Sequence, residues 1–202
     1  MIKEACKQLK SAAILLLILT LVTGGFYPLI VTGIAQFFFP WQANGSLIKK
    51  DNKVVGSMLI GQAFSGPYYF WGRPSATTPY PYNAARSAGS NWGPSSPAFL
   101  TTIKKRIVHF REYEPSDNRL IPIDLITASG SGLDPEISLL AAFYQVSRVA
   151  KARNIPAKTL EALINRLTKK RTMLVLGEPR VNVLELNLAL DEISRMHAAT
   201  AS

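Results

Sequence analysis

The chain opens with a long apolar stretch that follows a short group of charged residues. No charged side chain occurs from Ser11 to Pro40, and the segment reads SAAILLLILTLVTGGFYPLIVTGIAQFFFP. A bilayer's hydrocarbon core needs only about 20 helical residues to cross. The pattern therefore predicts one membrane span. We divide the chain into a short basic N-terminus (1–11), a transmembrane helix (12–34) and a single α/β domain (35–202).

Gly24, Gly25 and Pro28 interrupt the apolar stretch. Proline removes a backbone donor and crowds the preceding turn, so a kink is expected here. The glycines also allow another helix to approach closely. We take these three residues as candidates for contact with a partner helix. Simple tolerance of glycine and proline in lipid is the alternative.

A cleaved signal peptide is the alternative interpretation of the whole segment. Its apolar core is then Ile14 to Val22, followed by the small residues Thr23, Gly24 and Gly25. The apolar run, however, continues to Phe39, beyond the about 7–15 residues usual in a signal sequence. This length favours an anchor that is retained.

The next part of the chain alternates apolar runs with turn residues. Asn44-Gly45 predicts a turn. Val54 to Ile60 is typical of a buried strand, and the aromatic run Phe64 to Trp71 is a candidate to pair with it. Gly72 to Pro97 is rich in proline and aromatic residues and predicts a long ordered loop, a type that often has a functional role.

Four helices are predicted after this loop, from helical spacing of apolar residues and from capping residues. The first begins at Ser96-Pro97, the second at Asp134-Pro135 and runs toward Arg153, the third follows Pro156, and the fourth begins at Asn182 with Glu185 completing a capping box. Thr172 to Leu176 is a candidate short strand. The fold class is one transmembrane helix plus a mixed α/β domain, helix-rich in its C-terminal half.

Charge sets the expected orientation. The chain has a net charge of +10, and Lys3, Lys7 and Lys10 precede the span. Short basic flanks stay on the cytoplasmic side, so we expect the N-terminus inside and the domain outside. The one cysteine, Cys6, lies before the span, so the domain has no disulfide to hold it.

Several kinds of chemistry lack their sequence signals. One span cannot line a pore by itself, and no GxxxxGK[ST] phosphate loop or Asp-Lys-Thr-Gly phosphorylation segment occurs. The two histidines, His109 and His197, lie in predicted helices, far from any motif. Without a cysteine in the domain they do not suggest a metal site. No catalytic residue, resident cofactor or nucleic-acid partner is predicted.

The most suggestive polar segment is TASGSGLDP, Thr127 to Pro135. Ser129, Gly130, Ser131 and Gly132 precede a predicted helix, and glycine-rich leads into helices can hold anions. The structural alternative is a tight lead-in loop whose side chains cap the helix. A basic run follows later, Arg166, Lys169, Lys170 and Arg171, which can meet anionic headgroups or a partner's acids; a solvated face is the simpler interpretation.

Taken together, the segments resemble one family, the C subunit of the Kdp-type potassium-transporting ATPase of bacteria. The match is collinear and covers nearly the whole chain. Its most specific parts are Asp124 with TASGSGLDP, and LGEPRVNVL from Leu176 to Leu184. Further matching segments are Tyr27-Pro28, Gln42 to Leu47, Leu59 to Gln62, Arg73 to Ala76, Gly89 to Asn91, Gly93-Pro94, Gln145 and Arg148 to Ala150.

The resemblance implies an accessory subunit of a complex that hydrolyses ATP to import potassium with high affinity. Its partners are a channel-like subunit that holds the ion, a P-type ATPase subunit and a small one-span subunit, all in the bacterial inner membrane. The family is described as a catalytic chaperone that raises the ATP affinity of the P-type subunit, which makes Ser129 to Gln145 a candidate nucleotide contact.

Cytoplasmic ATP, however, cannot meet a domain that the lysines place outside. A second mechanism is therefore open, in which the domain caps the channel-like subunit and stabilises assembly. Its contact candidates lie in the long loop and include Arg73, Asn91 and Trp92. A membrane-anchored binding module or hydrolase that acts alone is the alternative from another class.

Overall fold

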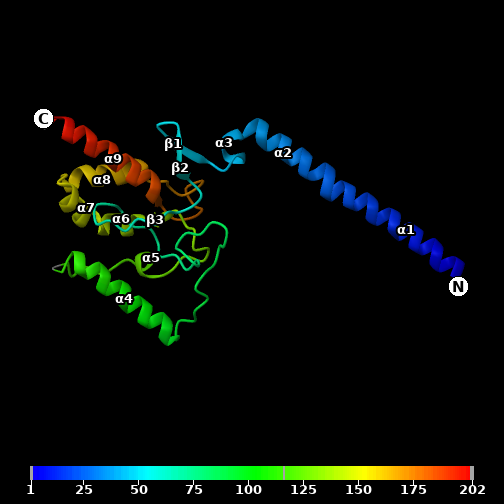
Figure 1. The fold of residues 1–202 in the computed structure, drawn as a ribbon, viewed down its shortest axis with the longest axis horizontal. Helices are drawn as coiled ribbons and strands as arrows, with labels where there is room; N and C mark the ends of the chain where they lie inside the picture. The colour runs from blue at the N-terminus through cyan, green and yellow to red at the C-terminus, as the bar shows by residue number, and fades with distance from the viewer. Residues whose placement is uncertain (1, 116, 201–202) are drawn as a thin grey trace. The chain divides into compact units, whose positions relative to one another are not determined.

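The computed structural model describes residues 2–115 and 117–200 and contains two compact units, one ending at Leu47 and one beginning at Ile48 (Figure 1). The first unit is a long helix built from α1 (Ile2–Leu21), a π-helical turn η1 (Val22–Phe26) and α2 (Tyr27–Phe38), followed by the short α3 (Pro40–Ala43). By length and composition, Glu4–Phe38 is suited to cross a membrane. The apolar helix predicted from the sequence is present.

The π-helical turn has a local cause. Pro28 lacks the N–H that would donate to the carbonyl of Gly24, and its ring crowds that carbonyl. The N–H of Tyr27 instead donates to the carbonyl of Val22, five residues back. The irregularity predicted from Gly24, Gly25 and Pro28 therefore takes the form of a widened turn, with helix on both sides.

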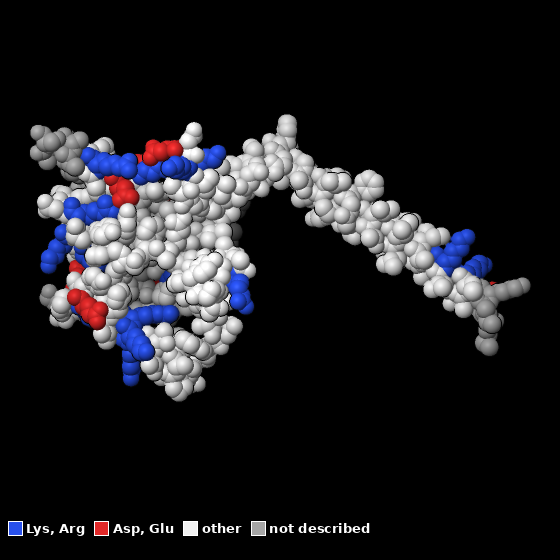
Figure 2. All heavy atoms as spheres, in the orientation of Figure 1, with Lys and Arg blue, Asp and Glu red and all other residues white. Residues whose placement is uncertain are grey.

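Apolar side chains cover the surface of this helix. Leu29 is 73% exposed and Phe37 79%, and Figure 2 shows no charge along the helix beyond its first turns. A Cβ atom built on Gly24 or Gly25 meets nothing within 4 Å. A helix that is apolar all round needs lipid or another helix to cover it.

The hairpin β1 (Leu47–Lys50) and β2 (Lys53–Ser57) comes next, and from Ile48 on it belongs to the second unit. Asp51 and Asn52 form its turn with φ of 51° and 62°, the left-handed backbone that two-residue hairpin turns require. The prediction for this region was partly wrong. The strand ends at Ser57 and is not buried, and its partner is β1 rather than Phe64–Trp71, where the structure has no strand.

The core of the domain lies among its C-terminal elements. A two-stranded antiparallel sheet, β3 (Glu136–Ser138) and β4 (Arg180–Asn182), packs with α6 (Leu139–Tyr144), α7 (Val146–Arg153), α8 (Ala157–Leu167) and α9 (Val183–Thr200) (Figure 1). Residues without exposed surface include Val149, Leu160, Ile164, Val181, Leu186 and Leu190. α4 (Pro97–Tyr113) packs with α5 (Ile123–Ile126), and α5 contacts β3.

The predicted helices are confirmed at three of four starts. The Ser96 side chain accepts from the N–H of Phe99 at the start of α4, α8 follows Pro156, and the Asn182 side chain accepts from the N–H of Glu185 in α9. The carboxylate of Glu185 lies 3.7 Å from Lys169 Nζ.

The second helix was predicted to start too early. Pro135 is followed by β3, which pairs with β4, and Ser138 caps α6 instead. The helix is also divided at Gln145. Thr172–Leu176 is a tight turn closed by one bridge, not a strand that joins a sheet. In both places pairing with distant residues decides the backbone, and local patterns do not report it.

Candidate functional site

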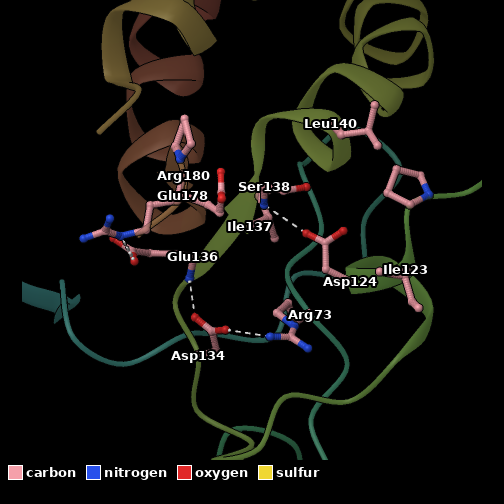
Figure 3. A pocket seen from close by; sticks show the side chains of 12 residues that line it. Arg73, Ile123, Asp124, Asp134, Glu136, Ile137, Ser138, Leu140, Glu178 and Arg180 are labelled. Atoms are coloured by element: carbon pink, nitrogen blue, oxygen red, sulfur yellow. Dashed lines mark hydrogen bonds and ion pairs between the residues drawn. The ribbon is translucent and has the colours of Figure 1, made fainter. Parts of the chain in front are cut away.

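A pocket of about 480 Å³ opens between segments that come from the first and the second half of the domain's sequence (Figure 3). Its wall comes from the long loop, from α5, from β3 with the first residues of α6, and from the segment that leads into β4. The lining residues are Arg73, Pro122, Ile123, Asp124, Asp134, Glu136, Ile137, Ser138, Leu140, Glu178, Pro179 and Arg180.

Most charges on the pocket wall are neutralised within it. Arg73 lies 3.2 Å from Asp134, and Arg180 Nε lies 2.6 Å from the carboxylate of Glu136. Asp124 accepts from the N–H of Ser138 at 2.9 Å, and no cation is paired with it among the described residues. Asp124 therefore brings an uncompensated negative charge to the pocket.

Arg73 has one further property. Its Nε is buried and has no hydrogen-bond partner among the described residues, while its terminal nitrogens reach Asp134 and the carbonyl of Ala128. A buried donor without a partner is unfavourable by about 1–3 kcal/mol. The terminal nitrogens of Arg73 thus bond to the residues that flank the glycine-rich segment, while its Nε lacks a hydrogen-bond partner among the described residues.

The rim of the pocket is apolar and exposed. Ile123 is 73% exposed and Leu140 70%, and both line the pocket mouth. Leu120, at 92%, is exposed in the segment that leads to α5. Exposed apolar groups gathered around a pocket with few free charges are typical of a surface that binds another protein chain.

The glycine-rich segment Ser129–Gly132 lies against the long loop. The N–H of Ser129 donates to the carbonyl of Pro74, and the carbonyl of Gly132 accepts from Ser75 Oγ. The carbonyl of Ser131 accepts from the N–H of Ala88. These bonds hold the long loop in place. The segment leads into β3 and not into a helix, so neither the predicted helix start nor its capping by these side chains is present. A nucleotide contact by Ser129, Gly130, Ser131 or Gly132 stays a prediction.

Gln145, the fifth nucleotide candidate, is 1% exposed. Its Oε1 accepts from the N–H of Trp71 and from Arg148, and its Nε2 donates to the carbonyls of Trp71 and Ala141. All of its hydrogen-bonding capacity on the amide is thus directed to the interior. A nucleotide contact by Gln145 also remains untested.

Arg148 continues this buried network. Its guanidinium lies 3.8 Å from the ring centre of Trp71 and donates to the backbone carbonyls of Pro67 and Tyr69. Burial lowers the pKa of Arg148 to about 10. His109 stacks on Trp71 as well, with ring centres 5.2 Å apart, and so belongs to the packing of α4; the side chain of His197 lies outside the described residues.

Within the domain, the predicted partner contacts Arg73, Asn91 and Trp92 do not all line the pocket. Arg73 lines the pocket. Asn91 and Trp92 are exposed further along the loop, where Trp92 makes an edge contact with Phe99. Gly24, Gly25 and Pro28 belong to the helix of the first unit.

Asp124, Ile123 and Leu140 line the pocket but were not among the site residues predicted from the sequence. The available signal was weak. Ile123 and Leu140 are apolar residues that an amphipathic pattern assigns to a core, and only exposure in the fold distinguishes them. Within residues 2–115 and 117–200, no group of three or more His, Cys, Asp or Glu side chains is placed to hold a metal ion.

The fold and the pocket define a class of protein: a domain that follows a long apolar helix and carries an apolar-rimmed pocket. The family model described as "K+-transporting ATPase, c chain" matches residues 9–192. The chain therefore belongs to the c-chain family of the K+-transporting ATPase, which confirms the resemblance found in the sequence.

Curated relatives agree with the family match. A potassium-transporting ATPase KdpC subunit from Methylococcus capsulatus is 57% identical over 184 residues, covering 91% of this chain and 97% of the relative. One from Paraburkholderia phytofirmans is 56% identical over 87% of this chain and 92% of the relative. One from Dechloromonas aromatica is 55% identical over 93% and 98%.

Proposed function

We propose that this chain is an accessory subunit of a high-affinity, ATP-driven potassium import complex, needed for the assembly and function of its channel-like and P-type subunits. The observation that carries the proposal is the family match across residues 9–192 in a chain with one candidate membrane span. A small one-span subunit is the third partner. The chain itself contributes binding surfaces rather than a reacting group.

The proposed placement is a single pass through the bacterial inner membrane, with the N-terminus in the cytoplasm. Lys3, Lys7 and Lys10 favour this orientation. The domain then lies on the extracytoplasmic side of the membrane, where it meets the extracytoplasmic loops of its partners. The capping of the channel-like subunit requires this orientation.

In the favoured mechanism, the domain caps the entrance of the channel-like subunit. The apolar rim at Ile123 and Leu140 covers an apolar segment of that subunit, and Asp124 pairs with a basic side chain on the same segment. The long loop adds Trp92 and Tyr80, which are 42% and 58% exposed. Burial of these side chains on binding supplies the stabilisation.

The nucleotide-chaperone mechanism is the second candidate, because the family resemblance implies it. It requires ATP, held with the P-type subunit, to reach Ser129–Gln145. The hydrogen bonds of Ser129, Ser131 and Gln145 inside the domain give it less support than the capping mechanism. If the domain lies on the extracytoplasmic side, it can change the ATP affinity of the P-type subunit only through a conformation of that subunit. Both the contact with the domain and the binding of ATP must favour this conformation.

The orientation is tested with a membrane-impermeant maleimide on intact cells. The native Cys6 serves as one probe, and Leu120→Cys in a chain that carries Cys6→Ser serves as the other. We expect labelling at position 120 only. Labelling at Cys6 only places the domain in the cytoplasm, which removes the objection to the nucleotide mechanism and contradicts the capping mechanism.

The function is tested by deletion of this chain. We expect loss of the assembled complex and of potassium-stimulated ATP hydrolysis. If both persist unchanged, the accessory-subunit proposal is wrong. A stable monomer in mild detergent, with an activity of its own and no larger membrane subunits co-eluting, would support the alternative of an anchored module or hydrolase that acts alone.

A further inference from the structure

A turn between α8 and β4 exposes four consecutive apolar side chains to solvent. Met173, Leu174, Val175 and Leu176 are 82%, 83%, 71% and 58% exposed. We call these four residues the apolar tip. Single exposed apolar residues are ordinary on protein surfaces, but a contiguous group at the end of a protruding turn indicates a binding surface.

The apolar tip has a defined backbone. Thr172 and Leu176 exchange two hydrogen bonds, each 2.9 Å long, and the N–H of Val175 also donates to the carbonyl of Thr172. Met173 and Leu174 have φ of 52° and 68°. Side chains other than glycine rarely adopt this left-handed conformation, so the fold holds apolar side chains where a solvated turn would favour glycine or asparagine.

Charged groups hold the neck of this turn. Lys169 and Arg180 exchange backbone hydrogen bonds of 2.9 and 3.1 Å, and the side chain of Arg171 donates to both carboxylate oxygens of Glu178 at 2.7 Å. Lys170 is exposed beside them. Cations thus lie directly behind the apolar tip, in the basic run that the sequence shows from Arg166 to Arg171.

We propose that the apolar tip inserts into the headgroup and upper acyl region of the bilayer, with Lys170 at the level of the lipid phosphates. This proposal rests on the membrane anchor of the proposed function. Since α2 ends at Phe38 and the domain begins at Ile48, only a short segment separates the anchor from the domain. A bilayer is therefore within reach of the domain's surface.

The chemistry of the tip favours lipid over a protein partner. Its four side chains have no N–H or O–H group, so they can enter the acyl region without the loss of a hydrogen bond to water. The backbone N–H groups of Leu174, Val175 and Leu176 are already bonded within the turn, which lowers the free-energy cost of taking this backbone out of water. Apolar residues in front of exposed cations are the pattern of interfacial membrane contacts.

The test uses the full-length chain with Cys6→Ser and one new cysteine, Leu174→Cys, labelled with an environment-sensitive fluorophore. The chain is reconstituted into phosphatidylcholine–phosphatidylglycerol vesicles that contain a lipid with a quencher near its headgroup. Leu120→Cys, at an equally exposed leucine outside the tip, is the matched control. We expect lipid quenching at position 174 to be at least about threefold that at position 120, and iodide quenching to be correspondingly lower.

Equal quenching at the two positions, by lipid or by iodide, overturns the proposal. A second result also overturns it. If the lipid quencher never reaches the label at position 174, and iodide is excluded only after the ATPase subunits are added, a protein partner covers the tip. A second label at Val175→Cys checks that the result does not depend on the loss of Leu174.

Carbonate extraction of the same vesicles separates this proposal from the anchor. If the chain stays in the vesicles while lipid quenching at position 174 is absent, the tip proposal fails and the anchor stands. If carbonate releases the chain, the anchor fails and the tip proposal fails with it. In the double variant Met173→Ser/Leu174→Ser, with the label at Val175→Cys, we expect the lipid quenching to fall to the level at position 120.

Discussion

The side-chain amide of Gln145 hydrogen-bonds to both backbone groups of Trp71: Oε1 accepts from the N–H at 2.8 Å and Nε2 donates to the carbonyl at 3.1 Å. Asn187 makes the same pair of bonds to Phe70, each 2.9 Å long. Two amides thus supply to a loop what a neighbouring strand supplies within a sheet. This arrangement explains how an irregular segment crosses the interior of the domain.

Replacement of Gln145 by alanine should destabilise the domain. The backbone N–H and carbonyl of the buried Trp71 each lose a hydrogen-bond partner, and each such loss is worth about 1–3 kcal/mol. We expect the free energy of unfolding to fall by about 2–6 kcal/mol in denaturant titrations. Asn165→Ala removes an exposed amide from α8 and should change it by less than about 0.5 kcal/mol. Similar losses in the two variants would contradict the role of Gln145.

Two glycines of the same segment should respond differently to alanine. Gly132 has φ of +68°, and a Cβ there would lie 2.6 Å from the carbonyl oxygen of Ala88. We expect Gly132→Ala to lower stability by at least about 1–2 kcal/mol from the backbone conformation alone. Gly130→Ala places its Cβ in open space and should be close to neutral. Thermal unfolding of the two variants measures the difference, and equal melting temperatures would refute the packing of this segment on the long loop.

Substitution at the pocket rim should impair assembly without unfolding the domain. Leu140 is exposed, so Leu140→Ser should leave the melting temperature nearly unchanged. If a partner covers Leu140, binding loses about 1.5–3 kcal/mol, which corresponds to a factor of about 10–100 in affinity. Recovery of the complex after affinity purification measures this loss. Val108→Ser, at an exposed valine on α4, is the control, and an equal effect of the two variants would exclude a specific role for the rim.

Tyr82 should make stability depend on pH in the alkaline range. Burial raises the pKa of Tyr82 to about 12, with a further contribution from Asp134. The unfolded chain loses this proton near pH 10 and the folded chain near pH 12, so stability is intact below pH 10 and falls as pH rises between these values. The loss is about 2–3 kcal/mol.

The variant Tyr82→Phe isolates this contribution. It also loses the hydrogen bond from the phenol to the carbonyl of Arg73, worth about 1 kcal/mol at pH 8. We therefore expect wild type to be more stable than the variant at pH 8 and the gap to close or reverse by pH 12. Arg148 has a pKa of about 10, below its usual range, so its contribution to stability rises with pH above about pH 10. This contribution is the same in wild type and variant and does not change the gap between them. A gap that does not change with pH would rule out the burial of Tyr82.

The sequence located the elements whose cause is local. Ser96-Pro97 and Asn182 predicted helix starts because a capping side chain and its N–H are only a few residues apart. The predicted helix start at Asp134-Pro135 was wrong, because this cap-like pattern is followed by β3. That strand exists because it pairs with β4, more than forty residues later in the chain. Of the residues that line the candidate site, Arg73 had been named as a partner contact, whereas Asp124 and Leu140 had not been named as site residues, and the glycine-rich segment is not part of the lining.

The apolar span, its interruption at Pro28 and the family membership were determined by the sequence alone, because each depends on composition or on a run of neighbouring residues. The pocket, the pairing of Arg73 with Asp134, the buried amide of Gln145 and the exposure of Met173–Leu176 were decided only by the tertiary structure. Whether an apolar residue lies in the core or on the surface depends on which distant elements cover it. A pattern of neighbouring residues does not show which elements these are.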